Sequence, residues 1–259
     1  MAAVRVESEC FSLQKAGNRK DEYEDAFHSS LTVHKDTAYY RFAIADGASE
    51  SSFADIWADL LASGYCNGQF DSKHLDKSIA KLSKAWKRTL NPKALPWYAQ
   101  EKLASGAFST LAGITFRLTD ASSAAFDAIA VGDSCIFHIR GDTIIAFFPL
   151  GSVEDFRNRP VLISSNAASN VHLQSFVKRW SGMAQAGDSF WLMTDALACW
   201  FWTRYEEDKS VIQRIRGLAS EQDFIHLVQA ERQFRCRDGS FSLRNDDVTF
   251  IRVHLVKGM

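Results

Sequence analysis

The 259-residue sequence contains no long apolar run and no export segment. No stretch approaches the roughly 18 apolar residues that a membrane-crossing helix needs. The N-terminus, MAAVRVESECFSLQ, lacks the apolar stretch of roughly 7–15 residues that follows a charged start in a secretory signal. We therefore expect a protein with no membrane partner, located in the cytoplasm.

Cysteine is scarce and shows no pairing pattern. The sequence has five cysteines, an odd number, and none of them forms a C-x-x-C pair. This pattern is typical of a protein in a reducing compartment, and it argues against a thiolate metal site or a cysteine nucleophile.

Neither sign of charge is in excess. Thirty Lys and Arg residues face thirty-one Asp and Glu residues, which gives a net charge of −1, and no basic run of five or more residues occurs. Because proteins that bind nucleic acids usually carry a cluster of basic residues that contacts the phosphate backbone, we expect no nucleic-acid partner.

Proline and glycine are few, and they form no linker. With four prolines, fourteen glycines and no internal repeat, residues 1–259 are interpreted as a single domain. Stretches with alternating polarity predict strands, and apolar residues at three- and four-residue spacing predict helices. The expected strands cover residues 4–13, 25–34, 38–46, 109–118, 123–133, 134–142, 143–150, 188–194 and 246–256. The expected helices cover residues 49–64, 75–90, a segment ending at 106, and the chain from about 195 to about 234.

The order of these elements predicts an α+β fold. Strands, two long helices, a meander of strands, further helices and a last strand suit two packed antiparallel β-sheets flanked by helices on both sides, a four-layer αββα sandwich. The polar segment 151–170, GSVEDFRNRPVLISSNAASN, is expected to be a flap loop on the surface.

Carboxylates recur where the predicted strands end. FAIAD ends at Asp46, AIAVGD at Asp133 and FWLMTD at Asp195, while Asp246 and Asp247 immediately precede the last strand. Several carboxylates close together would repel one another, and a hard divalent cation such as Mg²⁺ or Mn²⁺ relieves that repulsion. A metal site is one interpretation. The other is that these aspartates merely start turns and cap helices.

Six short motifs, taken in order, resemble those of the metal-dependent PPM family, the type 2C protein Ser/Thr phosphatases, and the compact chain resembles the bacterial members. They are GNRKDEYEDAF, AIADGA, STLAGITF, AVGDSCIFHIR, WLMTDAL and NDDVTFI. All six lie between residue 17 and residue 252. Each motif is weak alone, but their shared order is specific to this family.

The resemblance implies a site with two divalent ions, Mg²⁺ or Mn²⁺. By this resemblance, Asp46 bridges the two ions and the Gly47 carbonyl oxygen binds one of them. Asp195 and Asp246 complete the ligand set of the other ion. Asp133 matches the position that in bacterial relatives shares a third ion with Asp195.

The resemblance also assigns residues around the metals. Glu24 and Asp25 match an acidic pair that orients waters, and they count with the metal-binding aspartates as catalytic residues. Lys20 lies where the family usually has a phosphate-binding arginine, and Arg19 lies beside it. Either cation suits a phosphate, Arg19 as a bidentate fork and Lys20 as a point charge.

The implied activity is hydrolysis of phosphoserine and phosphothreonine. A water that bridges the two ions would attack the phosphorus in line. The implied substrate is a phosphorylated protein, and the implied partner is a cognate Ser/Thr kinase. The chain is expected to act as a monomer.

Departures from the family pattern keep a second function open. Where the family has Asp-Gly-His-Gly-Gly or Asp-Gly-x-Gly-Gly, this chain has Asp46-Gly47-Ala48-Ser49-Glu50. The histidine proposed as a general acid in eukaryotic members is therefore missing. The alternative is a catalytically impaired regulatory module on the same fold, which binds a phosphoprotein or a kinase.

Overall fold

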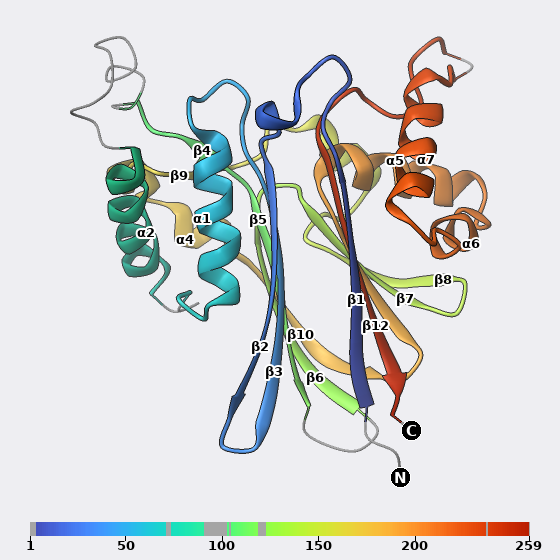
Figure 1. Cartoon of the computed structure of the whole chain (residues 1–259), viewed down its shortest axis with the longest axis horizontal. Coiled ribbons are helices and arrows are strands. Elements are labelled where there is room, and N and C mark those ends of the chain that lie inside the picture. The colour runs from blue at the N-terminus through green and yellow to red at the C-terminus, as the bar shows by residue number, and fades with distance from the viewer. Residues whose placement is uncertain are drawn as a thin grey trace.

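Two five-stranded antiparallel sheets face each other in the computed structural model of the chain (Figure 1). The structure describes residues 4–70, 74–90, 103, 105–118, 123–236 and 238–258. In spatial order, sheet A consists of β1 (Val4–Leu13), β12 (Val248–Lys257), β11 (Asp188–Met193), β7 (Cys135–Arg140) and β8 (Thr143–Phe148). Sheet B consists of β10 (Lys178–Gln185), β6 (Ser123–Val131), β5 (Leu111–Leu118), β3 (Thr37–Asp46) and β2 (Asp25–His34).

The core between the sheets follows from the alternation of side chains along each strand. Phe42, Phe116 and Phe126 of sheet B are buried there with Phe190 and Ile251 of sheet A. The ring of Phe190 meets the rings of Phe116 and Phe126 edge to face, with centroids 5.0 and 5.1 Å apart. These aromatic contacts hold the two sheets face to face.

Helices cover the outer faces of both sheets (Figure 1). On the side of sheet B lie α1 (Ala54–Cys66), α2 (Leu75–Leu90) and the short α4 (Leu173–Phe176). On the side of sheet A lie α5 (Asp195–Glu207), α6 (Val211–Arg216) and α7 (Glu221–Gln233). The predicted four-layer αββα sandwich is thereby confirmed. No helix in the described part of the chain is both long enough and apolar enough to cross a membrane.

Several predicted elements differ in detail from those observed. Helix α2 has the expected bounds, but α1 begins at Ala54 rather than near residue 49. The helix expected between the segment NPKALP and residue 106 falls mostly on residues 97–102 and 104, which lie outside the described residues. Strand β10 is not among the expected elements. The segment 151–170 contains the short strand β9 (Ile163–Ser164), which pairs with β4 (Phe108–Ser109). That segment also holds two 3₁₀ turns, η3 (Val153–Arg157) and η4 (Ala167–Asn170).

Candidate active site

The aspartates at the strand ends lie at one edge of the sandwich. Asp46 ends β3, and the antiparallel register places Asp25, the first residue of β2, directly opposite it. Asp195 begins α5 immediately after β11, and Asp246 lies just before β12, the strand that pairs with β11. Asp133 occupies the turn that takes the chain from β6 in sheet B to β7 in sheet A. Residues from both sheets therefore reach one rim.

The electrostatics of Asp46 show that these carboxylates interact. Burial raises the pKa of Asp46 well above its usual value, and neighbouring negative charges raise it further. The charges responsible belong to Asp25, Asp195, Asp133 and Asp246. The strand-ending aspartates thus converge in space, which their spacing in the sequence does not show.

Asp25 is buried and joins the two sheets. Its carboxylate accepts hydrogen bonds from the hydroxyl groups of Thr194 (3.0 Å) and Thr249 (2.7 Å), both contributed by the sheet A side. Burial raises the pKa of Asp25 well above its usual range, and the two hydrogen bonds offset part of that shift. This carboxylate is therefore held in one orientation beside Asp46.

Burial also perturbs the pKa values of Asp133 and Asp246. The pKa of Asp133 is raised to about 7, first by burial and then by the charge of Asp195. Burial and Asp195 likewise raise the pKa of Asp246, while the nearby guanidinium of Arg244 lowers it in part. Clustered groups with raised pKa values are typical of functional sites.

The backbone at Asp46 and Gly47 permits no larger residue at position 47. A Cβ atom at Gly47 would lie 2.6 Å from the carbonyl oxygen of Glu24 and 2.9 Å from that of Ala54. The chain at Asp46 is held by Thr110, whose hydroxyl accepts from the Asp46 N–H at 3.0 Å and whose own N–H donates to the Asp46 carbonyl at 2.9 Å. The end of β3 is consequently fixed from both sides.

Arg244 is a member of this site that the sequence motifs do not indicate. Its guanidinium pairs with the Asp195 carboxylate and lies 3.1 Å from a carboxylate oxygen of Asp246. A protein cation therefore lies between two of the expected metal ligands. Within the described residues, no three acidic, histidine or cysteine side chains are gathered closely enough to hold a metal ion as they stand.

Asp247, for which the sequence analysis gives no role of its own, positions the loops around the site. Its buried carboxylate accepts hydrogen bonds from the backbone N–H groups of Lys15 (2.7 Å) and Glu24 (2.8 Å). The Glu24 side chain accepts a hydrogen bond from Ser49. Asp247 thus fixes the segment that carries Glu24 and Asp25, and its only sequence signal is its place beside Asp246.

The two expected phosphate-binding cations lie at the surface. Arg19 is three-quarters exposed, and its Nε is 3.1 Å from a carboxylate oxygen of Asp21. Lys20, the first residue of the 3₁₀ turn η1 (Lys20–Glu22), is exposed as well. Among the described residues, no hydrogen bond or ion pair joins either side chain to the acidic rim.

The donor atoms of the rim suit a hard divalent cation. Carboxylate and backbone carbonyl oxygens are the ligands that Mg²⁺ and Mn²⁺ prefer. The half-buried Asp46 carboxylate receives no hydrogen bond from a described residue, whereas that of Asp25 receives two. A bound cation would supply the charge compensation that Asp46 lacks. The chemistry of these donor atoms therefore fits such an ion, although the side chains of the described residues, as they stand, do not form a closed ligand set.

Comparison with known proteins agrees with this fold and identifies the family of the chain. Residues 17–233 match the family model of protein phosphatase 2C. Because the match covers well over half of the sequence, the chain belongs to the protein phosphatase 2C family, and the resemblance seen in the motifs is confirmed. Among curated proteins, no sequence matches the chain.

Three solved structures illustrate the shared fold. The photosystem II phosphatase PBCP has 14% identity and a TM-score of 0.60, with 98% of this chain and 100% of that chain covered. The catalytic domain of the phosphatase PstP, solved with two manganese ions, has 15% identity and a TM-score of 0.57 over 98% and 100% of the chains. The phosphatase Stp1 from Staphylococcus aureus has 16% identity and a TM-score of 0.55 over 99% and 97%.

Proposed function

We propose that this protein is a metal-dependent protein Ser/Thr phosphatase that hydrolyses phosphoserine and phosphothreonine in a phosphoprotein. The supporting observation is the convergence of five aspartates on one rim, where burial and the charges of the other four raise the pKa of Asp46. Membership of the protein phosphatase 2C family is consistent with this chemistry. The two manganese ions of the PstP catalytic domain support a divalent cofactor, Mg²⁺ or Mn²⁺.

In this proposal, the rim would hold two ions. Asp46 would bridge them, the Gly47 carbonyl oxygen would complete one ligand set, and Asp195 with Asp246 would complete the other. Asp133 would share a third ion with Asp195. When bound, the ions supply activation of a water molecule for in-line attack and neutralisation of the phosphoryl charge.

The protein's own groups supply orientation. Asp25, held by Thr194 and Thr249, keeps a fixed acceptor beside Asp46 and orients water there. Glu24, whose backbone N–H is fixed by Asp247, provides a second acceptor. Since Ala48 and Ser49 follow Gly47, no imidazole is supplied at these positions, and the leaving oxygen takes its proton from solvent.

Substrate contacts are proposed on both sides of the rim. Arg19 and Lys20 remain the proposed phosphate-binding residues, and they must turn inward from the surface to reach it. A cavity of about 420 Å³ beside the segment that follows Asp46 and Gly47 is lined by Ser51, Phe108 and Arg159. Arg159 would meet an acidic residue that flanks the phosphorylated one.

A second candidate function is favoured by one observation. Because Arg244 pairs with Asp195 and approaches Asp246, it competes for two of the proposed ligands. A guanidinium that outcompetes the second ion would leave a regulatory module that binds a phosphoprotein or a kinase without turnover. Metal affinity in an Arg244 variant separates the two functions.

Hydrolysis of p-nitrophenyl phosphate against Mn²⁺ and Mg²⁺ concentration tests the proposal. The wild type is expected to show metal-dependent turnover, and Asp46→Asn and Asp195→Asn are expected to lose it. Glu206→Gln, which removes an exposed charge from the same helix as Asp195, is the matched control and should keep full activity. No turnover by the wild type, with metal still bound, would support the regulatory module instead.

A further inference from the structure

Arg244 is the only cation in the described part of the chain that forms an ion pair with a carboxylate of the acidic rim. One terminal nitrogen of its guanidinium, Nη2, makes both contacts. It donates a hydrogen bond to the Asp195 carboxylate, and it lies 3.1 Å from a carboxylate oxygen of Asp246. One corner of the guanidinium is therefore held by two of the proposed metal ligands.

The rest of the Arg244 guanidinium faces solvent. A guanidinium carries N–H groups on all three of its nitrogens. Among the described residues, none accepts a hydrogen bond from Nε or Nη1, and the side chain is 56% exposed. These two nitrogens can therefore donate to a ligand that arrives from solvent.

The backbone that carries Arg244 is fixed on both sides. Before it, the buried Leu243 donates its N–H to the carbonyl oxygen of Glu231 at 3.2 Å. After it, the side chain of Asn245 accepts from the backbone N–H of Ala16 at 2.7 Å and donates to the Ala16 carbonyl oxygen at 3.1 Å. The position of Arg244 at the rim is thus set by the fold, and only its side chain is left to adjust.

The charge of Arg244 acts on all four proposed metal-binding aspartates. Burial lowers the pKa of Arg244, but the charges of Asp195, Asp246 and Asp46 outweigh burial and raise the pKa above its usual value. Burial raises the pKa of Asp133, and the charge of Arg244 offsets part of that rise. The guanidinium is therefore close to the whole set of carboxylates rather than to one of them.

A phosphorylated side chain needs positive charge at this rim because its phosphate is close to a dianion at neutral pH. The five aspartates carry up to five negative charges, whereas two divalent ions would supply four positive ones. Arg244 supplies a fifth. Without it, an approaching phosphoryl group would meet an excess of negative charge.

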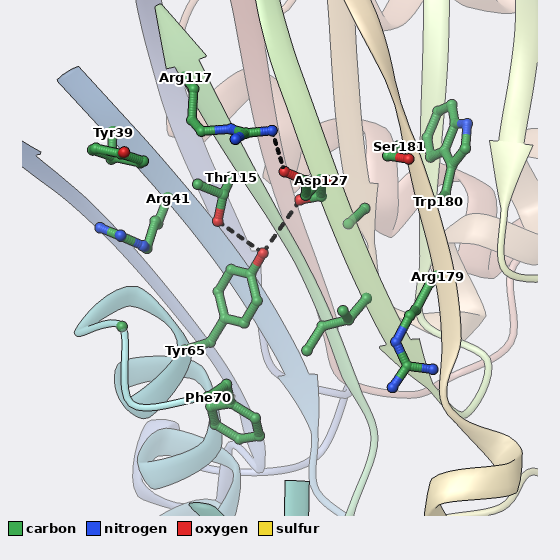
Figure 2. Close-up of a pocket in the computed structure, with 13 residues that line it drawn as sticks. Tyr39, Arg41, Tyr65, Phe70, Thr115, Arg117, Asp127, Arg179, Trp180 and Ser181 are labelled. Carbon is green, nitrogen blue, oxygen red and sulfur yellow. Dashed lines mark hydrogen bonds and ion pairs between the residues drawn. The ribbon is translucent and has the colours of Figure 1, made fainter. Parts of the chain in front are cut away.

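Other arginines of the chain lie away from the rim. Figure 2 shows Arg41 and Arg117 around Tyr65, in a cavity of about 530 Å³ on the outer face of sheet B. Arg117 pairs there with Asp127 at 2.8 Å. Arg41 precedes Asp46 by five residues in β3, or about 17 Å along an extended strand. Neither is placed to contact a phosphate held at the rim.

We propose that Arg244 binds the phosphoryl oxygens of the substrate through the N–H groups of Nε and Nη1. The proposal rests on the proposed phosphatase function. It adds Arg244 to the two surface cations, Arg19 and Lys20, and Arg244 already lies at the rim. The guanidinium that weakens metal binding thus strengthens phosphate binding by charge-assisted hydrogen bonds. Removal of Arg244 should therefore change the two affinities in opposite directions.

Binding of inorganic phosphate tests the contact directly. Calorimetric titration is done on protein saturated with Mg²⁺, in which phosphate stays soluble, and the wild type is expected to bind. Arg244→Met should raise the Kd about tenfold or more, and Arg244→Lys should recover part of the loss because it keeps the charge. Arg5→Met is the matched control, because Arg5 is 58% exposed and paired with Glu7 near the start of β1; it should bind like the wild type.

The metal affinity of the same variants separates a phosphate contact from a structural effect. Arg244→Met should bind Mn²⁺ more tightly than the wild type while it binds phosphate more weakly. A variant with a disordered loop would lose affinity for both, and thermal unfolding shows whether the fold is kept. Weakening of both affinities, or a phosphate affinity equal to that of the wild type, would overturn the proposal.

Kinetics then show which part of the substrate Arg244 contacts. At saturating metal, Arg244→Met should lower kcat/KM about tenfold or more for p-nitrophenyl phosphate and for a phosphothreonine peptide alike, because both carry the phosphate. A loss confined to the peptide would overturn the proposal.

The calorimetric result does not depend on turnover, so the two proposals fail in different ways. A wild type that binds phosphate through Arg244 but hydrolyses neither substrate would support this contact and contradict the phosphatase function. A wild type that hydrolyses both substrates, and does so equally well in Arg244→Met, would contradict the contact alone.

Discussion

Asp46→Asn is expected to make the metal-free protein more stable than the wild type, while it removes the stabilisation that Mn²⁺ provides. The Asp46 carboxylate is crowded by four other aspartates and receives no hydrogen bond from a described residue. An asparagine has nearly the same shape but carries no charge. The substitution therefore removes the repulsion and keeps the packing.

The size of the effect follows from Coulomb's law. Two carboxylates about 6 Å apart in a medium with an effective dielectric constant near 20 repel each other by about 3 kcal/mol. Protonation of Asp46 and the positive charge of Arg244 offset part of this, so a net gain of about 1–3 kcal/mol is expected. For a chain of this length, that gain corresponds to an increase in Tm of about 3–8 °C.

The dependence on pH has a definite sign. The pKa of Asp46 is higher in the folded protein than in the unfolded chain, where it is about 4. Below about pH 4 the carboxyl is protonated in both states and does not lower the free energy of unfolding. As the pH rises from about 4 toward the folded-state pKa, the folded protein loses stability. The advantage of Asp46→Asn should therefore be largest at neutral pH and should vanish near pH 4.

Thermal unfolding with and without Mn²⁺ is the assay. Mn²⁺ at a hundred times its Kd should raise the free energy of unfolding of the wild type by about 2.7 kcal/mol, and that of the variant far less. Glu206→Gln, which removes an exposed charge, should shift neither curve. A variant that is less stable than the metal-free wild type at pH 7, or one that gains as much from Mn²⁺, would refute the reasoning.

Three further substitutions test other parts of the site and the fold. Arg244→Met should tighten Mn²⁺ binding about tenfold or more in calorimetry, because a positive charge that pairs with two acids is removed; unchanged affinity would contradict the competition. Asp247→Ala should lower the free energy of unfolding in urea by about 2–4 kcal/mol, since two charge-assisted backbone hydrogen bonds are lost. Asp188→Asn should lower the free energy of unfolding in urea by about 1–3 kcal/mol at pH 7. Burial opposes ionisation of Asp188, but hydrogen bonds, led by the one from Arg140, hold its pKa below the usual value. The difference in stability between the wild type and the variant should therefore fade as the pH falls below about 4.

Much of the fold could be predicted because its signals are local. Helix α2 has a clear amphipathic pattern and begins and ends where expected. Asp46, which ends β3, and Asp195, which follows β11 and Thr194, can be recognised because an apolar strand leads to each one. Strand β10 was missed because it is an edge strand in which Ala184 is fully buried while Arg179 and Met183 are exposed. Its hydrophobic pattern is therefore weak.

The parts of the site that were missed depend on contacts between distant segments. Arg244 acts through Asp195, which is 49 residues away in the sequence, so no local motif marks it. Asp247 acts through the backbone of Lys15 and Glu24, more than 200 residues away. Such features follow from the pairing of the sheets rather than from any short pattern.

The number of Mn²⁺ ions bound per chain tests the central claim most directly. Calorimetric titration of the wild type, read together with turnover of a phosphothreonine peptide, is predicted to give two ions and metal-dependent hydrolysis, and both should be lost in Asp46→Asn. Turnover that is independent of added metal, or a wild type that binds no Mn²⁺, would contradict the assignment of the acidic rim as the phosphatase site.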